Sequence, residues 1–246
     1  MVNMQKFGLS DRMAAVAGLV PHGVRACDVG CDHGFVSIYL VREQICPSVI
    51  AMDINRGPLL RAKEHIESAR LSAYIETRLS DGIEKLLPGE AECMIAAGMG
   101  GRLIVKILED HPETLSSLRY LVLQPQSELR FVREYLRRKG FVIRKEDMVL
   151  EDGKFYPMML AEVLCPGEVR RGAGSEEEID NYRYHLEDAF GPCLIKEKHP
   201  VLLEYLTFWE AQQEKIWKEV QAYPERRAQV EEELGRIRDA RRLMQS

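Results

Sequence analysis

The stretch CDVGCDHGF, residues 27–35, decides the fold. An apolar run leads into it, glycines stand at positions 30 and 34, and an apolar helical pattern begins at Phe35. This order predicts a buried strand, a tight turn and a helix. Gly30 permits the turn and lets a ligand approach the backbone, and the start of the helix offers free N–H groups. The stretch is either a structural joint or a ligand-binding turn, and the rest of the chain favours the second reading.

Strand-like and helical patterns alternate on the carboxyl side of this stretch. Such alternation predicts an α/β fold with a parallel sheet covered by helices. Several of the strand-like runs are apolar on both faces, as strands buried on both sides should be. The expected strands are residues 25–29, 48–53, 73–79, 93–97 and 120–124, and the expected helices are residues 35–42, 59–70, 103–109 and 128–139.

The sheet is expected to finish in an antiparallel hairpin. Two strand-like runs, residues 141–150 and 155–163, flank the sequence EDGK, and Asp-Gly between such runs is a strong hairpin signal. Ser127 can cap the helix before the hairpin, and Gly140 can end it. A parallel sheet closed by an antiparallel pair is a specific architecture.

A second domain is expected at the carboxyl end. The composition becomes small and polar after Pro166, which predicts a linker between a domain of residues 1–165 and a helical domain of residues 175–246. Apolar residues then recur at spacings of three and four, as in a coiled-coil seam. Pro224 can join two antiparallel helices in that seam.

Composition restricts the class of protein. The 246 residues are 46% hydrophobic and 30% charged, with a net charge of −5, as in an ordinary globular protein. No apolar run approaches the ~20 residues that span a bilayer, and the apolar run near the N-terminus lacks a cleavage signal, so we expect a cytoplasmic protein. The six cysteines form no CxxC pair, so no metal site is expected.

Carboxylates follow the expected strands at the edge where a pocket would lie. Asp28 and Asp32 crowd the glycine turn, Asp53 ends the second strand, and Asp81 follows the third. The dinucleotide fingerprint is absent, and these charges would repel a pyrophosphate. They suit a cationic nucleoside such as S-adenosylmethionine, although Asp53 and Asp81 could also be cap and turn residues. The neighbouring residues that could assist are Asn55 and Gly82.

Two further segments reach the same edge. The glycine-rich sequence at residues 97–101 follows the fourth strand, where it is either a flexible loop or room for a flat ligand. Gln124 and Gln126 follow the fifth strand and can read a base edge or cap the next helix.

These motifs, taken in order, resemble the bacterial tRNA (adenine-N1)-methyltransferases that modify adenine 22. The similarity covers essentially the whole chain. It is carried by the motif at residues 28–34, by Asp53, and by the motifs at residues 80–82, 97–101 and 151–156, with residues 9–12 also similar.

The resemblance implies a class I methyltransferase fold of seven strands, S-adenosylmethionine as methyl donor, and tRNA as substrate. By the same match, Gly30, Asp32 and Gly34 would line the methionine part of the donor, Asp53 its ribose and Asp81 its adenine. Two positions depart from methyltransferases at large: Asp32 replaces the middle glycine of the common loop, and residues 98–101 replace the Asn/Asp-Pro-Pro-Tyr motif of amino-group methyltransferases.

The second departure fits the chemistry of adenine N1. This atom already carries an in-plane lone pair, so alignment and desolvation suffice and no strong general base is required. The product is cationic, so a carboxylate or carbonyl near the base should stabilise it. Asp11, with the backbone at Gly98 and Met99, is the candidate, although Asp11 could simply cap the first helix.

The target adenine must be unpaired or flipped out, because N1 lies on its pairing edge. Tyr156 or Phe155 could stack on it, or could belong to the hairpin core. Arg12, Arg133 and Arg137 are candidate RNA contacts on two helices, and further arginines follow in the C-terminal helices. Interleaved glutamates allow the alternative that these are solvated helix surfaces.

The residues are also compatible with other functions. A methyltransferase acting on a small molecule or a protein would need no basic C-terminal face, and a non-catalytic RNA-binding relic would not bind the donor. A nicotinamide dehydrogenase is disfavoured by the glycine spacing. A monomer is expected rather than a homodimer, although the heptad-like helices could pair within or between chains.

Overall fold

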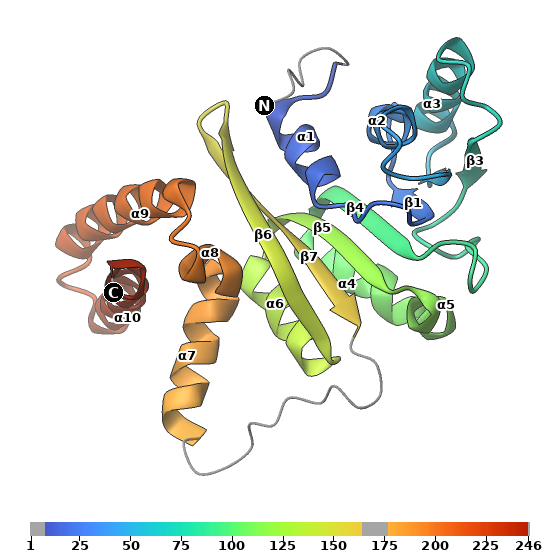
Figure 1. The fold of residues 1–246 in the computed structure, drawn as a ribbon. Helices are drawn as coiled ribbons and strands as arrows, with labels where there is room; N and C mark the ends of the chain where they lie inside the picture. Colours follow the sequence, from blue (N-terminus) through green and yellow to red (C-terminus); the bar gives the residue numbers. More distant parts are fainter. Residues whose placement is uncertain (1–7, 164–176, 246) are drawn as a thin grey trace. The chain divides into compact units, whose positions relative to one another are not determined.

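The computed structural model describes residues 8–163 and 177–245. The chain divides into two compact units, Met1–Val169 and Arg170–Ser246. The first unit is built on one sheet, and the second consists of helices (Figure 1).

The sheet of the first unit has seven strands in the order β3-β2-β1-β4-β5-β7-β6. The pairs from β3 to β5 are parallel, whereas β7 is antiparallel to both β5 and β6. This arrangement confirms the predicted α/β sheet with its antiparallel hairpin. The strands are β1 (Ala26–Val29), β2 (Val49–Asp53), β3 (Ile75–Leu79), β4 (Cys93–Gly100), β5 (Tyr120–Ser127), β6 (Phe141–Glu151) and β7 (Lys154–Val163).

Helices cover both faces of this sheet. One buried cluster joins α1, α2 and α3 to one face, and the other joins α4 and α6 to the opposite face. Neighbouring residues of β1 enter different clusters, Ala26 one and Cys27 the other, because strand side chains alternate. The helices are α1 (Asp11–Gly18), α2 (Phe35–Arg42), α3 (Arg56–Ser68), α4 (Gly101–Asp110), α5 (Pro112–Ser117) and α6 (Leu129–Arg138).

Three local expectations need correction. Strand β4 runs to Gly100, three residues further than predicted, because a register shift after Ala97 lets the glycine-rich segment keep pairing with β5. Helix α5 was not predicted. Ser127 does not cap α6: Glu128 occupies the cap position in the left-handed region, with φ 55°.

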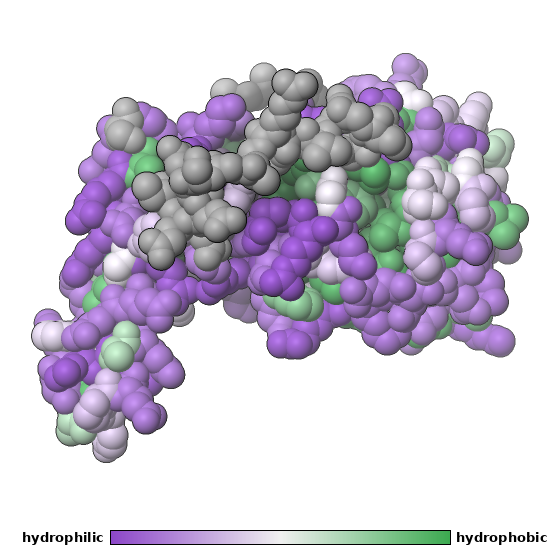
Figure 2. Space-filling view, turned by 90° about the horizontal axis from the view of Figure 1, so that it is seen from below, coloured by the Kyte–Doolittle hydropathy of each residue, from purple (hydrophilic) through white to green (hydrophobic). Residues whose placement is uncertain are grey.

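The second unit contains α7 (Glu177–Phe190), α8 (Pro192–Lys196), α9 (Pro200–Glu219) and α10 (Pro224–Gln245). Helices α9 and α10 run antiparallel, since Trp217 bonds to Glu231 and Glu210 bonds to Arg238. Their apolar seam is closed within the chain, and most of the surface seen in Figure 2 is hydrophilic. Among the described residues, no helix combines the length and the apolar character needed to cross a membrane.

Candidate active site

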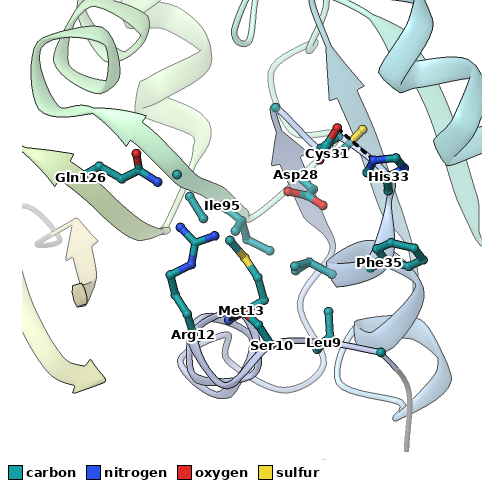
Figure 3. Close-up of a pocket in the computed structure, with 16 residues that line it drawn as sticks. Leu9, Ser10, Arg12, Met13, Asp28, Cys31, His33, Phe35, Ile95 and Gln126 are labelled. Atoms are coloured by element: carbon teal, nitrogen blue, oxygen red, sulfur yellow. Dashed lines mark hydrogen bonds and ion pairs between the residues drawn. The ribbon is translucent and has the colours of Figure 1, made fainter. Parts of the chain in front are cut away.

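A cavity of about 430 Å³ opens at the carboxyl ends of β1 and β4. Its walls come from four places: the start of α1, the turn between β1 and α2, the end of β4, and Gln126 of β5. Asp28 lies between these walls, and Figure 3 draws His33 and Phe35 on one side of it and Arg12 and Gln126 on the other. This is the edge where a doubly wound sheet places its ligands.

The turn after β1 is wound tightly by backbone bonds. The N–H groups of Gly30 and Cys31 both donate to the carbonyl of Met52, at 2.8 and 2.9 Å. Gly30, Asp32 and Gly34 all have positive φ, of 72°, 48° and 72°. Asp32 stands in the left-handed region, which aspartate adopts more readily than most residues other than glycine. Gly30, Cys31, Asp32 and His33 of this turn line the cavity.

Gly34 is required for a second reason. A Cβ at this position would lie 3.1 Å from the Cβ of Ala62 in α3. The glycine thus lets α2 and α3 approach each other directly beneath the turn.

Asp28 is a buried acid at the cavity. It is 5% exposed, and its Oδ2 accepts a hydrogen bond from the Ser37 hydroxyl at 2.7 Å. Burial raises the pKa of Asp28 to about 6, against the lowering effect of the bond from Ser37. As the pH falls through about 6, Asp28 takes up a proton and becomes neutral. Above that pH the site holds a buried anion, which a cation would stabilise.

The neighbouring strand tips carry the other predicted acids. The carboxylate of Asp53 accepts the N–H of Asn55 at 2.8 Å and the N–H of Asp32 at 3.3 Å, so it ties the β2 tip to the glycine turn. Asp81 is exposed beyond β3, and Gly82 packs against Ile107. Asp53, Asn55, Asp81 and Gly82 are not among the described residues that line the cavity. They lie next to it, along the same edge of the sheet.

Arg12 is held on the opposite wall by three partners. Its Nη1 donates to Gln124 Oε1 at 3.3 Å, its backbone N–H donates to Glu151 at 3.1 Å, and its guanidinium carbon lies 4.8 Å from the ring centroid of Tyr156. The same Gln124 oxygen accepts the N–H of Gly98 at 3.1 Å. Side chains from β5 and the hairpin thus set the position of Arg12 beside Gly98.

Comparison with known proteins identifies the family. A model described as a methyltransferase domain matches residues 9–159. The tRNA (adenine(22)-N(1))-methyltransferase of Bacillus subtilis (strain 168) is 34% identical over 205 residues, which cover 83% of this chain and 82% of the relative. The chain belongs to the tRNA (adenine(22)-N(1))-methyltransferase family. The resemblance inferred from the motifs is confirmed.

Solved structures agree with this assignment to the methyltransferases. The crystal structure of the B. subtilis m1A22 tRNA methyltransferase TrmK superposes with a TM-score of 0.79 and 28% identity, covering 96% of this chain and 99% of that chain. A Streptococcus pneumoniae protein solved in complex with S-adenosyl-L-methionine has a TM-score of 0.78 and 30% identity, and it covers 94% of this chain and 99% of that chain.

Only some of the predicted site residues of this methyltransferase line the cavity. Asp28, Gly30, Asp32, Gly98 and Gln126 line it directly, together with Arg12. Met99 is half-buried, and its methyl group lies over Gly30 so closely that a Cβ there would collide with it. Met99 therefore covers the glycine turn from the side of β4.

Asp11 and Gln124 need different roles from those expected. Ser10, not Asp11, caps α1, because its hydroxyl accepts the N–H of Met13 at 3.3 Å. Asp11 is exposed, and the described residues lining the cavity do not include it. Gln124 is fully buried, so it does not read a base edge. Its amide oxygen instead links Arg12 to Gly98.

The expected role of Arg133 in α6 is also wrong. Arg133 is 1% exposed, and its Nε donates to Glu146 of β6 at 2.9 Å, so this buried residue is not an RNA contact. Arg137 is half-buried on the same helix. In the second unit the acidic neighbours also matter: Arg238 pairs with Glu210 and Glu214 across the helices.

Two site residues escaped the sequence analysis. Glu151 lies 139 positions from its partner Arg12, and no spacing rule connects them. Ser37 stands in an apolar helical run, where its burial against Asp28 is visible only in the folded chain. Among the described residues no group of three or more His, Cys, Asp or Glu side chains forms a metal-binding arrangement.

Proposed function

We propose that this methyltransferase moves the methyl group of S-adenosyl-L-methionine to N1 of adenine 22 in tRNA. The main support for this proposal is the cavity, which has the buried acid Asp28 at one side and Arg12, Gly98 and Gln126 at the other. The family assignment and the donor bound in the S. pneumoniae relative support the same reaction.

The residues on the donor side fit a cationic cosubstrate. Asp28 is a buried carboxylate whose raised pKa reflects the cost of its charge, and a positively charged ligand offsets that cost. The turn at residues 30–34 supplies exposed backbone, and Asp53 and Asp81 lie at the next two strand tips for the nucleoside hydroxyls and the base. S-adenosylmethionine supplies an activated methyl group on a sulfonium.

The acceptor side needs to orient a base rather than to deprotonate it. In the reaction the N1–methyl bond forms as the sulfur–methyl bond breaks, so the positive charge passes from sulfur to the adenine. N1 attacks with its own lone pair, and Arg12 and Gln126 are placed to align the adenine and exclude water at Gly98. Glu151 beside Arg12 offsets the guanidinium charge near the cationic product.

The helical unit is proposed to hold the tRNA, with the enzyme acting as a monomer in the cytoplasm. The apolar seam between α9 and α10 is buried within one chain, which leaves it no need of a second copy. Light scattering at micromolar concentration tests the monomer.

Incubation with labelled S-adenosylmethionine and unmodified tRNA tests the reaction. N1-methyladenine blocks pairing, so reverse transcription should stop next to position 22. The matched substrate is the same tRNA with guanine at that position. Label entering both tRNAs equally, or entering neither, would disprove the proposed target.

A further inference from the structure

Three aromatic rings form a stack beside the cavity. Phe35 begins α2, His33 belongs to the glycine turn, and His65 comes from α3. The Phe35 and His65 centroids are 4.8 Å apart with an interplanar angle of 18°, and His33 lies 5.7 Å from each of the other two rings. His33 and Phe35 line the cavity (Figure 3). We call these three side chains the ring stack.

The ring stack is fixed before any ligand arrives. Nδ1 of His65 lies 2.9 Å from the carbonyl oxygen of His33, within hydrogen-bonding distance, so α3 holds the turn that carries the first ring. Gly34, between the two lining rings, packs on Ala62 of the same helix. A platform held in this way loses little conformational entropy when a flat molecule binds to it.

Phe35 of the ring stack is exposed to solvent and does not belong to the hydrophobic core. Phe35 is 42% exposed, although it begins a helix whose Ser37 and Leu40 are buried. An aromatic surface that lines a cavity and remains open to solvent is typical of a site for a planar group.

The charge beside the ring stack selects the kind of group. The Asp32 side chain is 67% exposed, and its carboxylate lies 3.7 Å from Nε2 of His33. An exposed carboxylate at this place repels a phosphate and leaves a neutral base unaffected. Proteins that recognise single-stranded RNA commonly stack unpaired bases on such rings.

We propose that the ring stack of His33, Phe35 and His65 is a platform for an unpaired base of the bound tRNA. This inference rests on the proposed function, since the acceptor adenine must leave its helix to expose N1, and bases around it then lose stacking partners. The ring stack gives such a base a new stacking partner beside the reaction cavity.

The test compares Phe35→Leu, which keeps apolar volume without a ring, with Phe35→Trp, which keeps a ring. The matched control is Tyr74→Leu, since Tyr74 is an aromatic residue with 54% exposure that does not line the cavity. Three quantities are measured for each protein: tRNA affinity by filter binding with S-adenosylhomocysteine present, donor affinity by calorimetry, and methylation rate. Thermal melting verifies that each variant folds.

Stacking is worth about 1–3 kcal/mol per base, so Phe35→Leu should weaken tRNA binding roughly 5- to 150-fold. The loss of tRNA affinity should exceed any loss of donor affinity, Phe35→Trp should restore tRNA affinity, and Tyr74→Leu should resemble the wild type. Unchanged tRNA affinity in Phe35→Leu, or a loss confined to donor affinity, overturns the platform. These outcomes leave the proposed reaction intact when wild-type protein still methylates adenine 22. A wild-type protein that methylates no tRNA contradicts the proposed reaction instead. In that case the tRNA affinities of the variants still test whether the ring stack binds a base.

Discussion

Nη1 of Arg12 and the N–H of Gly98 share one acceptor, the buried Oε1 of Gln124, at 3.3 and 3.1 Å. The first helix of the chain and the glycine-rich end of β4 are thereby set relative to each other by a side chain that does not line the cavity. Gln124 is a positioning residue for the acceptor wall.

Gln124→Met should lower the methylation rate while leaving donor affinity unchanged. Methionine fills the volume without an acceptor of comparable strength, so the N–H of Gly98 loses its bond at a cost of about 1–3 kcal/mol. We expect kcat to fall about 10- to 100-fold. Gln124→Glu keeps an acceptor oxygen and should recover most of the rate. Equal kcat in the two variants would contradict the positioning role.

Asp28→Asn should make the protein more stable and a poorer binder of its donor. The folded-state pKa of about 6 exceeds the ordinary value of 3.8, so between these pH values the folded chain holds more protons than the unfolded one. Stability attributable to this group therefore falls as pH rises from about 4 to 6 and stays low above. Removing the charge should recover up to about 3 kcal/mol at pH 7, measured by urea unfolding.

The same acid predicts a pH dependence of donor binding. Protonation removes the anion that the cationic donor needs, so calorimetry should show affinity falling as pH drops through about 6. In Asp28→Asn this dependence should vanish and affinity should be low throughout. A wild-type affinity that is constant from pH 5 to 8 would be evidence against Asp28 as the donor's counterion.

Glu146→Gln should destabilise the fold strongly. Arg133 and Glu146 pair at 2.9 Å with side chains only 1% and 0% exposed, and removing one partner leaves a buried charge. The expected loss is about 3–5 kcal/mol, measured by denaturant unfolding. Lys106→Ala breaks the exposed pair with Asp110 and serves as the control, with an expected change below about 1 kcal/mol. Similar losses in both variants would refute the difference in burial as the cause.

Gly34→Ala should disturb the glycine turn more than Gly153→Ala at the hairpin tip. The two glycines have similar positive φ, 72° and 71°, so the backbone cost is shared. Only at position 34 does the added Cβ meet another residue, Ala62 at 3.1 Å. We expect Gly34→Ala to melt several degrees lower and to bind the donor less tightly. Identical melting temperatures would show that α2 and α3 adjust without cost.

Lys215→Glu together with Lys218→Glu tests the helical unit. Both lysines are exposed on α9, whereas the arginines of α10 are largely engaged with acids such as Glu210. Charge reversal should weaken tRNA binding and flatten its dependence on salt, by about one unit of slope for each phosphate that the protein no longer neutralises. Binding of the donor should not change. An unaltered salt dependence of tRNA binding would show that these lysines do not contact the RNA.

The sequence by itself determined the succession of strands and helices along the first domain, apart from α5, together with the hairpin and the acidic strand tips. These features depend on neighbours along the chain: the apolar strand-like runs, the Asp-Gly turn, and glycines that tolerate positive φ. Their order also carried the family resemblance. Asp28 and Gly30 could therefore be assigned to the cavity from the chain alone.

Only the tertiary structure decided which polar side chains face inward and which partners they meet. Arg133 and Gln124 look like surface residues in the sequence, yet Glu146 and Gly98 satisfy them in the interior. The ring stack likewise joins residues 32 positions apart. Such contacts arise from how helices pack on the sheet, and packing depends on distance in space, which periodicity along the chain does not encode.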